Sequence, residues 1–198
     1  MLFSVPSQIG YGALAALVFA ESAGVPVPGE TALLTAGVLA GTGHLALPLV
    51  IAVGTGAAIL GDNLGYWLGR RGGRAVLLRG GWLGGHRRRA LVKGEQFFAR
   101  NGGKTVFLGR WVPGVRVVAA VLAGASAMSW RRFVLYNATG ALAWAGSVAS
   151  VAAAFGPAGA AAWVTVTFGA ALVAGAVTAL RARMRRQRER GLATEVAA

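Results

Sequence analysis

Five charged side chains of this 198-residue chain lie beside or inside uncharged apolar runs and could do chemistry: Glu21, Glu30, Asp62, Arg110 and Arg116. A charge at the centre of a bilayer costs about 2.5 to 3.5 kcal/mol on insertion scales, so such residues are functional candidates. Guanidinium groups bind phosphate oxygens two at a time, and a low-dielectric site favours the protonated form of a carboxyl group. These residue types predict a phosphate site whose acids pair with arginines or carry protons.

The two glutamates flank a chain break that contains Pro26, Pro28 and Gly29. Proline ends a helix and glycine permits positive φ, so this segment predicts a reversal followed by an apolar half-helix. Glu30 opens that half-helix, where a carboxylate is favourable on helix-dipole grounds alone. A capping role therefore explains Glu30 without any part in transport.

The two arginines flank a second break, at Pro113 and Gly114. Arg116 stands where an apolar half-helix begins, and the N-terminus of a helix already carries positive partial charge. An arginine is unfavourable there by itself, but guanidinium and free backbone N–H groups together favour an anion. The alternative is a buried ion-pair network that only holds the two breaks together.

The composition indicates that lipid surrounds the elements that position these residues. Hydrophobic residues make up 56% of the chain and charged residues 13%, about half the share in soluble domains. The net charge is +14, but no Lys or Arg occurs between Met1 and Gly69, which argues against a nucleic-acid-binding protein. The chain has no cysteine, which excludes disulfides, thiolate metal sites and cysteine nucleophiles.

Uncharged runs predict an all-α, polytopic membrane protein with three to four transmembrane helices. A spanning helix needs about 20 apolar residues. The spans expected are Leu47 to Leu68 and a helical hairpin of Phe133–Phe155 and Ala158–Leu180, broken at Gly156-Pro157. Met1 to Ala20 lacks the basic start of a signal peptide and is expected to be a retained apolar helix.

Basic residues gather in residues 70–104, at Arg131-Arg132 and in residues 181–190, and the positive-inside rule places all three clusters in the cytoplasm. The same rule places His44 on the outer side of the membrane. Residues 105–130 must enter and leave on one face, which makes them a re-entrant loop. Residues 21–41 predict a second loop from the opposite face, and such a pair indicates an inverted repeat with a midplane site. The short match of Val38 to Gly41 with Val121 to Gly124 supports the repeat.

Several other features complete the predicted organisation. Residues 1–180 form one membrane domain, and residues 181–198 a basic cytoplasmic tail that frays. Residues 70–104 are expected to include an amphipathic helix on anionic headgroups, or else a solvated loop. Asn63 and Asn137 are expected to make interhelical hydrogen bonds, and the six tryptophans to include interfacial anchors. His44 and His86 lie too far apart along the predicted fold to share a metal site.

Three motifs together cover about residues 15 to 145: Glu21-x4-Pro26-x-Pro28-Gly29-Glu30, Gly61-Asp62-x3-Tyr66-x2-Gly69-Arg70, and Gly109-Arg110-x2-Pro113-Gly114-x-Arg116, followed by Asn137 and Trp144. They resemble the DedA family of the VTT, or SNARE-associated, superfamily. The resemblance implies two facing re-entrant loops and an activity that moves lipids across the membrane. In bacterial members this activity is the recycling of undecaprenyl phosphate, driven by the proton-motive force. Other relatives are lipid scramblases. The resemblance also implies that Glu21 and Glu30 match the functional acids of the family, and Arg110 and Arg116 its essential arginines.

The resulting hypothesis is a transporter, not an enzyme, in the bacterial inner membrane. It would move a phosphate-bearing lipid, undecaprenyl phosphate above others, between leaflets with the help of protons, without cofactor, metal or nucleic acid. A phospholipid scramblase and a small-anion transporter are alternatives that the same site would serve. A lipid phosphatase would need a nucleophile or general acid, usually histidine, near the arginines, and a passive scaffold would not need the buried charges. The sequence does not specify which lipid is carried or in which direction. It also leaves the oligomeric state open, and a homo-oligomer is one of the alternatives.

Overall fold

The computed structural model describes residues 7–73, 102–112 and 115–196 of the chain, and for parts of the last helix only the backbone. The regular secondary structure of the described residues is helical, with no strand among them. The elements in chain order are α1 (Ser7–Ser22), α2 (Gly29–Gly41), α3 (Leu47–Leu68), the π-helix η1 (Gly69–Gly73), α6 (Lys104–Leu108), the 3-10 helix η2 (Gly109–Trp111), α7 (Val115–Ala125) and α8 (Trp130–Val196). The prediction of an all-α protein is confirmed for these residues. The amphipathic segment expected in residues 70–104 lies mostly outside them.

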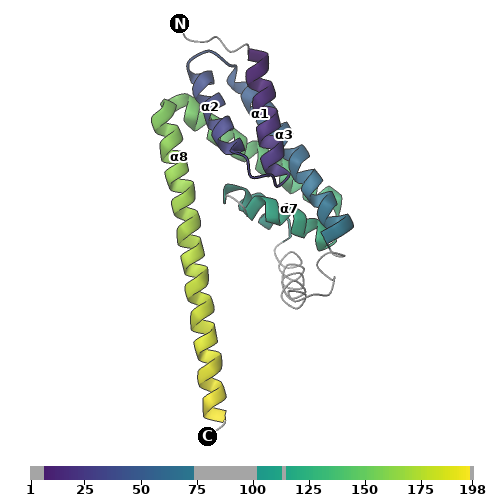
Figure 1. Ribbon diagram of the computed structural model, residues 1–198, viewed down its shortest axis with the longest axis vertical. Coiled ribbons are helices and arrows are strands. Elements are labelled where there is room, and N and C mark those ends of the chain that lie inside the picture. Colours follow the sequence, from purple (N-terminus) through teal and green to yellow (C-terminus); the bar gives the residue numbers. More distant parts are fainter. Residues whose placement is uncertain (1–6, 74–101, 113–114, 197–198) are drawn as a thin grey trace.

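Helices α1 and α2 form a hairpin with short arms (Figure 1). The chain reverses at Gly24, Pro26 and Pro28. Gly24 has a φ of 104°, which glycine adopts with little strain because it has no Cβ. Gly29 then starts α2 against the end of α1, and a Cβ there would lie 2.8 Å from the carbonyl oxygen of Leu17. The sequence prediction began the hairpin at residue 21, whereas α1 itself is its first arm.

Helix α3 has the bounds predicted for the first clear span, Leu47 to Leu68. Pro48 lies in its first turn, where a missing N–H removes no intrahelical hydrogen bond. The helix packs against α1 and α8, and Gly61 lets it approach the end of α1 closely, since a Cβ there would lie 2.7 Å from Ser22 Cβ. Close packing through small residues is the usual means of association for helices in lipid.

The second hairpin consists of α6 and η2, which lead into the break, and of α7, which leaves it. Pro113 and Gly114, where the reversal was predicted, lie outside the described residues. Helix α7 crosses the chain closely where α3 ends, and each of the two segments contributes a glycine to the crossing. A Cβ on Gly124 of α7 would collide with the carbonyl oxygen of Tyr66, and a Cβ on Gly69, directly after α3, would collide with that of Val121.

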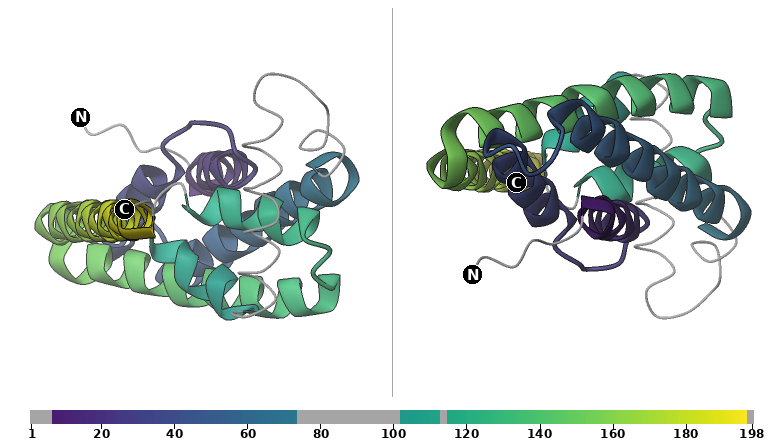
Figure 2. Two further views of the ribbon diagram at one scale, coloured as in Figure 1. Left: turned by 90° about the horizontal axis from the view of Figure 1, so that it is seen from below. Right: turned by 90° about the horizontal axis from the view of Figure 1, so that it is seen from above.

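Helix α8 is bent back on itself at Gly156, whose φ of 61° and ψ of −147° are not helical (Figures 1 and 2). The break predicted at Gly156-Pro157 is therefore confirmed. The second arm continues as a helix to Val196, so the prediction that the chain frays after Leu180 is wrong. The long carboxyl-terminal arm extends well beyond the rest of the protein in Figure 1.

The short sequence match between residues 38–41 and 121–124 has a structural counterpart. Gly41 ends α2 against the carbonyl oxygen of Ala153 in α8, and Gly124 lies near the end of α7 against the carbonyl oxygen of Tyr66 in α3. In both halves the matched glycine is therefore the point at which a short helix crosses a long one. This equivalence supports the interpretation of the two segments as related repeats.

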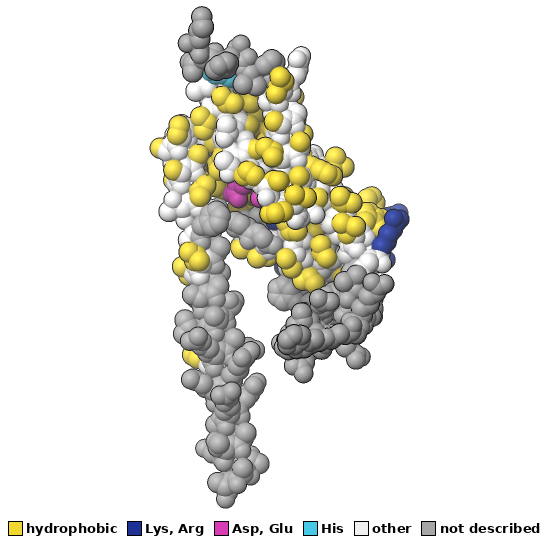
Figure 3. All heavy atoms as spheres, viewed as in Figure 1, with side chains coloured by type: hydrophobic (Ala, Val, Ile, Leu, Met, Phe, Trp, Pro, Cys, Tyr) yellow, Lys and Arg dark blue, Asp and Glu magenta, His cyan; other side chains and the backbone are white. Residues whose placement is uncertain are grey.

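The two ends of the protein differ in charge. The described basic side chains of Arg70, Arg71, Lys104, Arg131 and Arg132 lie where α3 ends and where α6 and α8 begin. His44 lies at the other end, before α3. Figure 3 shows hydrophobic side chains over much of the face between these ends, with acidic side chains in the middle of it.

Within the described ranges, two helical segments are long and apolar enough to cross a membrane, Leu47–Gly72 and Trp130–Thr167, the second of which includes the bend at Gly156. Large apolar side chains such as Leu60, Leu135 and Phe155 are exposed on these segments, as expected where the surrounding medium is lipid.

Candidate functional site

The two hairpins meet at an ion pair. Arg116, in the first turn of α7, forms an ion pair with Glu21, near the end of α1, with 2.5 Å between Nη2 and Oε1. The side chain of Arg116 is 4% exposed and that of Glu21 22%, so Glu21 is the more exposed partner of the pair. Gly24 adds to the contact, because a Cβ there would lie 3.3 Å from Val117. Glu21, which precedes the first chain break, is thus paired with Arg116, which follows the second.

A second ion pair lies deeper in the protein. Arg110 of η2 donates from Nη1 to Oδ2 of Asp62 in α3, and from the same nitrogen to Oδ1 of Asn137 in α8 over 2.6 Å. Asp62 and Asn137 are each 1% exposed and Arg110 is 3% exposed. Three separate elements therefore hold one guanidinium group inside the apolar body.

Trp144 of α8 lies next to both arginines. Its ring centroid is 5.7 Å from Cζ of Arg110 and 4.9 Å from Cζ of Arg116. An indole face attracts a cation, most strongly where water is excluded, and Trp144 is 1% exposed. One buried ring thus helps to keep two like charges near each other.

Glu30 does not join these pairs. Its Oε1 accepts a hydrogen bond of 3.0 Å from the indole Nε1 of Trp163, in the second arm of α8, and the structure gives it no ion pair with the described arginines. Among the described residues Glu30 is therefore not one of the acids that pair with an arginine. The reason is geometric: Glu30 leaves the first turn of α2 toward α8, whereas Glu21 leaves α1 toward α7.

The break residues of the first hairpin contact neither arginine in the described structure, but they position Glu21. Pro26 and Pro28 are exposed in the turn, and Gly29 is buried against Glu21, where a Cβ would collide with Oε2 of the carboxylate. A larger residue at position 29 would displace the partner of Arg116. The corresponding Pro113 and Gly114 cannot be placed, because they lie outside the described residues.

The remaining polar candidates have structural partners. Asn63 accepts a hydrogen bond of 2.9 Å from Trp130 Nε1, which joins α3 to α8 as predicted. His44 hydrogen-bonds to Thr42 on an exposed turn. Within the described ranges no group of three or more His, Cys, Asp or Glu side chains could hold a metal ion.

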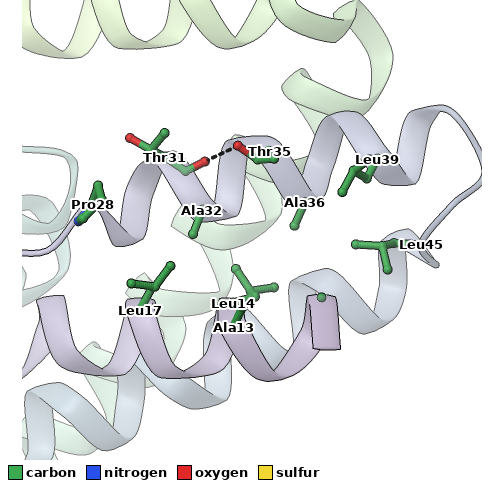
Figure 4. Close-up of a pocket in the computed structure, with 11 residues that line it drawn as sticks. Ala13, Leu14, Leu17, Pro28, Thr31, Ala32, Thr35, Ala36, Leu39 and Leu45 are labelled. Atoms are coloured by element: carbon green, nitrogen blue, oxygen red, sulfur yellow. Dashed lines mark hydrogen bonds between the residues drawn. The ribbon is translucent and has the colours of Figure 1, made fainter. Parts of the chain in front are cut away.

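Two apolar grooves border α2. One of about 330 Å³ lies between α1 and α2, and Figure 4 shows Ala13, Leu14 and Leu17 of α1 facing Ala32 and Ala36 of α2 across it.

The other groove, of about 580 Å³, lies between α2 and the second arm of α8 and is lined by Thr31, Leu34, Thr35, Val38, Pro157, Ala160, Ala161, Val164 and Thr165. Thr31 and Val164 are the chain neighbours of Glu30 and Trp163, so this groove begins beside their hydrogen bond.

Sequence reasoning missed Asn137 and Trp144 as parts of the site. Asn137 was expected only to join helices, and Trp144 was grouped with interfacial anchors, yet both contact Arg110. They are seven residues apart, which places them on one face of a helix two turns apart. That spacing of an amide and an indole, in the middle of an uncharged run, is the signal that could have indicated a polar site.

Residues 27–154 match the VTT domain family. The chain belongs to the VTT domain family. The match includes Glu30, Asp62, Arg110 and Arg116, and it begins six residues after Glu21.

Similar proteins extend this result. The VTT-domain chain is 41% identical over 145 residues to an uncharacterized membrane protein of Synechocystis, and this alignment covers 73% of the chain and 66% of that protein. It is 37% identical over 139 residues to Protein DedA of Escherichia coli, covering 68% of the chain and 63% of that protein. An uncharacterized membrane protein of Mycobacterium tuberculosis is 37% identical over 160 residues, with 76% of the chain and 71% of the relative covered.

These relatives make the protein a DedA family membrane protein, and the chain spans about two thirds of their length. No solved structure matches it.

Proposed function

We propose that the protein is a lipid translocase that moves a phosphate-bearing lipid, undecaprenyl phosphate above others, between the leaflets of the bacterial inner membrane, coupled to protons. The observation that carries the proposal is the pair of buried arginines, Arg110 and Arg116, on the second hairpin, each held by a carboxylate from another helix. Arginine binds phosphate through two parallel hydrogen bonds, and exchange of a carboxylate for a phosphate leaves its charge balanced.

The charge balance of the site supports proton coupling. The two guanidinium groups are neutralised by Glu21 and Asp62, so the empty site has no net charge from these four groups. A phosphomonoester carries about −1.5 to −2 at pH 7, and such a charge added to a low-dielectric site is costly. Protonation of one or both carboxyl groups as the phosphate enters would restore neutrality. Glu21 is the better candidate for the first proton, because its side chain is 22% exposed and that of Asp62 only 2%.

The lengths of the short helices support re-entry. At 1.5 Å per residue, α1 (16 residues), α2 (13 residues) and α7 (11 residues) reach about 24, 20 and 17 Å, less than the hydrocarbon thickness of about 30 Å. Each hairpin would therefore reverse inside the membrane. Their reversals meet at Glu21 and Arg116, which fits a midplane site with access from either leaflet.

The apolar grooves beside α2 favour a lipid over a small anion. A free anion needs a polar path on both sides of the site, whereas the tail of a lipid can stay in the groove while only the headgroup crosses. The larger groove has apolar walls with three threonines, and it begins beside Glu30. It would hold part of the tail near the level of the arginines.

The distribution of basic residues supports a cytoplasmic position for the carboxyl terminus. The described arginines of η1 and of the first turn of α8 lie at the end opposite His44, and the second arm of α8 returns from Gly156 toward that basic end (Figure 1). Positive residues favour the cytoplasmic side.

We propose transport rather than hydrolysis because, among the residues that the structure describes, the arginines contact carboxylates, an amide and an indole but no histidine, and His44 is at the far end of α3. Phosphate ester hydrolysis needs a nucleophile or general acid beside the bound phosphate. A passive scaffold would have no need of two buried ion pairs.

Headgroup movement by the purified protein in liposomes tests the proposal. Vesicles with a panel of phosphate lipids are given a pH gradient, and the accessible headgroup is measured over time. We expect movement that depends on the gradient and is lost in Arg110→Ala and Arg116→Ala. Glu21→Gln should keep the fold and lose the pH dependence. A Glu21→Gln protein whose flux still follows the gradient would remove Glu21 from proton coupling, and lipid flux equal to that of empty liposomes would refute translocation.

A further inference from the structure

One face of α8 lines the arginines of the second hairpin. Asn137, Gly140 and Trp144 are spaced three and four residues apart, so they share this face. Asn137 accepts a hydrogen bond from Arg110, and a Cβ on Gly140 would lie 3.6 Å from Cδ of Arg110. The centroid of the Trp144 ring lies 5.7 Å from Cζ of Arg110 and 4.9 Å from Cζ of Arg116. This face therefore supplies an uncharged contact to each guanidinium group.

The two arginines differ in how many partners they have. Arg110 binds a carboxylate and an amide in addition to the indole ring. Among the described residues, Arg116 has one polar side-chain partner, the carboxylate of Glu21, and the ring lies closer to it than to Arg110. Loss of its carboxylate leaves Arg110 with the amide, but it leaves Arg116 with the Trp144 ring.

Three features make Arg116 costly to keep in place without Glu21. Its side chain is 4% exposed, and it shares the ring with a second cation, Arg110. It also stands in the first turn of α7, where the helix dipole repels a cation. Protonation of Glu21 removes the opposite charge from this position. The attraction between a cation and an indole face does not titrate and is strongest where water is excluded, and Trp144 is 1% exposed.

We propose that Trp144 is a positioning residue for transport, which holds Arg116 in the site while the carboxyl group of Glu21 is neutral. The inference rests on the proposed function, in which Glu21 takes up a proton, and it adds the group that keeps the arginine in place during that step. The contact uses the face of the ring, which has no acceptor atom, so the N–H donors of Arg116 stay available.

Trp144 also belongs to the hydrophobic core that α1, α2, α3 and α8 form. Replacement by alanine would remove packing together with the cation–π contact, and a loss of transport would follow from either. The test must therefore change the electrostatics of the ring and keep its volume. Ring fluorination does so, because fluorine withdraws electron density from the face of the ring and changes its shape little.

Tryptophans with one, two and three ring fluorines are placed at position 144 by nonsense suppression, and lipid movement driven by a pH gradient is measured in liposomes. We expect the rate to fall with each fluorine, by about tenfold over the series, as one buried cation–π contact is lost. A rate that stays at the wild-type value across the series would overturn the role of Trp144. Wild-type flux equal to that of empty liposomes would refute the proposed function instead.

Trp67 is the matched control, because it makes a cation–π contact of the same kind outside the site. Its ring centroid lies 5.5 Å from Cζ of Arg71, and the residue is 40% exposed. We expect fluorination at position 67 to leave the rate of lipid movement unchanged. An equal loss of transport at both positions would overturn a specific role for Trp144.

Natural residues give a second series where a fluorinated protein is not obtained in sufficient amount. Trp144→Phe keeps an aromatic face, whereas Trp144→Leu fills part of the same space without one. We expect the Phe protein to keep more of the transport rate than the Leu protein does. Equal rates in the two proteins would contradict a cation–π role.

Thermal unfolding in detergent tests the contact without any need for transport. The fluorinated series is made in the wild-type protein and in Glu21→Gln, where the ring faces a cation whose charge is no longer balanced. We expect fluorination to lower the unfolding temperature more in Glu21→Gln, because ionised Glu21 cancels part of the attraction between the ring and Arg116. Equal losses in the two proteins would show that Trp144 does not take over from Glu21 and would overturn the proposal.

Discussion

Neutralising Asp62 should destabilise the protein far more than neutralising Glu21. Asp62→Asn keeps the shape of the side chain and removes the charge that balances Arg110, while both side chains of this pair are 2% exposed. Removing one partner of such a buried pair costs about 3 to 5 kcal/mol, because the other charge stays buried and uncompensated.

The same change at Glu21 leaves Arg116 beside a carboxamide in a more open position, since the Glu21 side chain is 22% exposed. We expect a cost of about 1 to 3 kcal/mol there, the range for one poorly satisfied buried donor. For a domain of this size, 1 kcal/mol lowers the unfolding temperature by about 2 to 4 °C, so Asp62→Asn should lower it by about 6 to 20 °C.

Thermal unfolding in detergent measures both variants side by side, with no added phosphate. The double variant Asp62→Leu/Arg110→Met removes both charges and should recover much of the lost stability, although not transport. An Asp62→Asn protein that unfolds at the wild-type temperature, or at a temperature no lower than that of Glu21→Gln, would refute the argument that loss of Asp62 leaves an uncompensated buried charge on Arg110.

Three further predictions use other parts of the structure. Arg116→Lys should impair transport at normal stability, because lysine keeps the charge but has no planar fork; full activity would refute bidentate binding there. Single cysteines at His44 and Arg131 of this cysteine-free chain should be labelled from opposite sides of the membrane, the second from the cytoplasm, and an outward label at position 131 would refute the second re-entrant hairpin. Gly124→Ala should cost about 1 to 3 kcal/mol, because the new methyl group meets a backbone carbonyl of α3, whereas Gly146→Ala, with open space around it, should be neutral or stabilising; equal unfolding temperatures would refute the close crossing.

The membrane character, the bounds of α3 and the bend of α8 were predictable from the sequence because all three depend on local composition. Leu47 to Leu68 is an uncharged run of spanning length, and α3 has the same bounds. Gly156-Pro157 combines a residue free to adopt positive φ with one that cannot continue a helix, and α8 bends there. The extension of α8 to Val196 was not predicted, because a basic, polar segment has no apolar period that indicates where it ends.

The types of the site residues were also determined by the sequence, since charges in apolar runs are few and two chain breaks mark where they gather. Their pairing was decided by the tertiary structure alone. Nothing in the order of residues assigns Asp62 to Arg110 and Glu21 to Arg116, or directs Glu30 to Trp163 in the second arm of α8. Each partner comes from a different helix, and the pairs form only where glycines allow those helices to cross closely. Hydrogen bonds and ion pairs act over a few ångströms between segments up to 133 residues apart, so which acid meets which base follows from the packing of the helices and not from the spacing of residues along the chain.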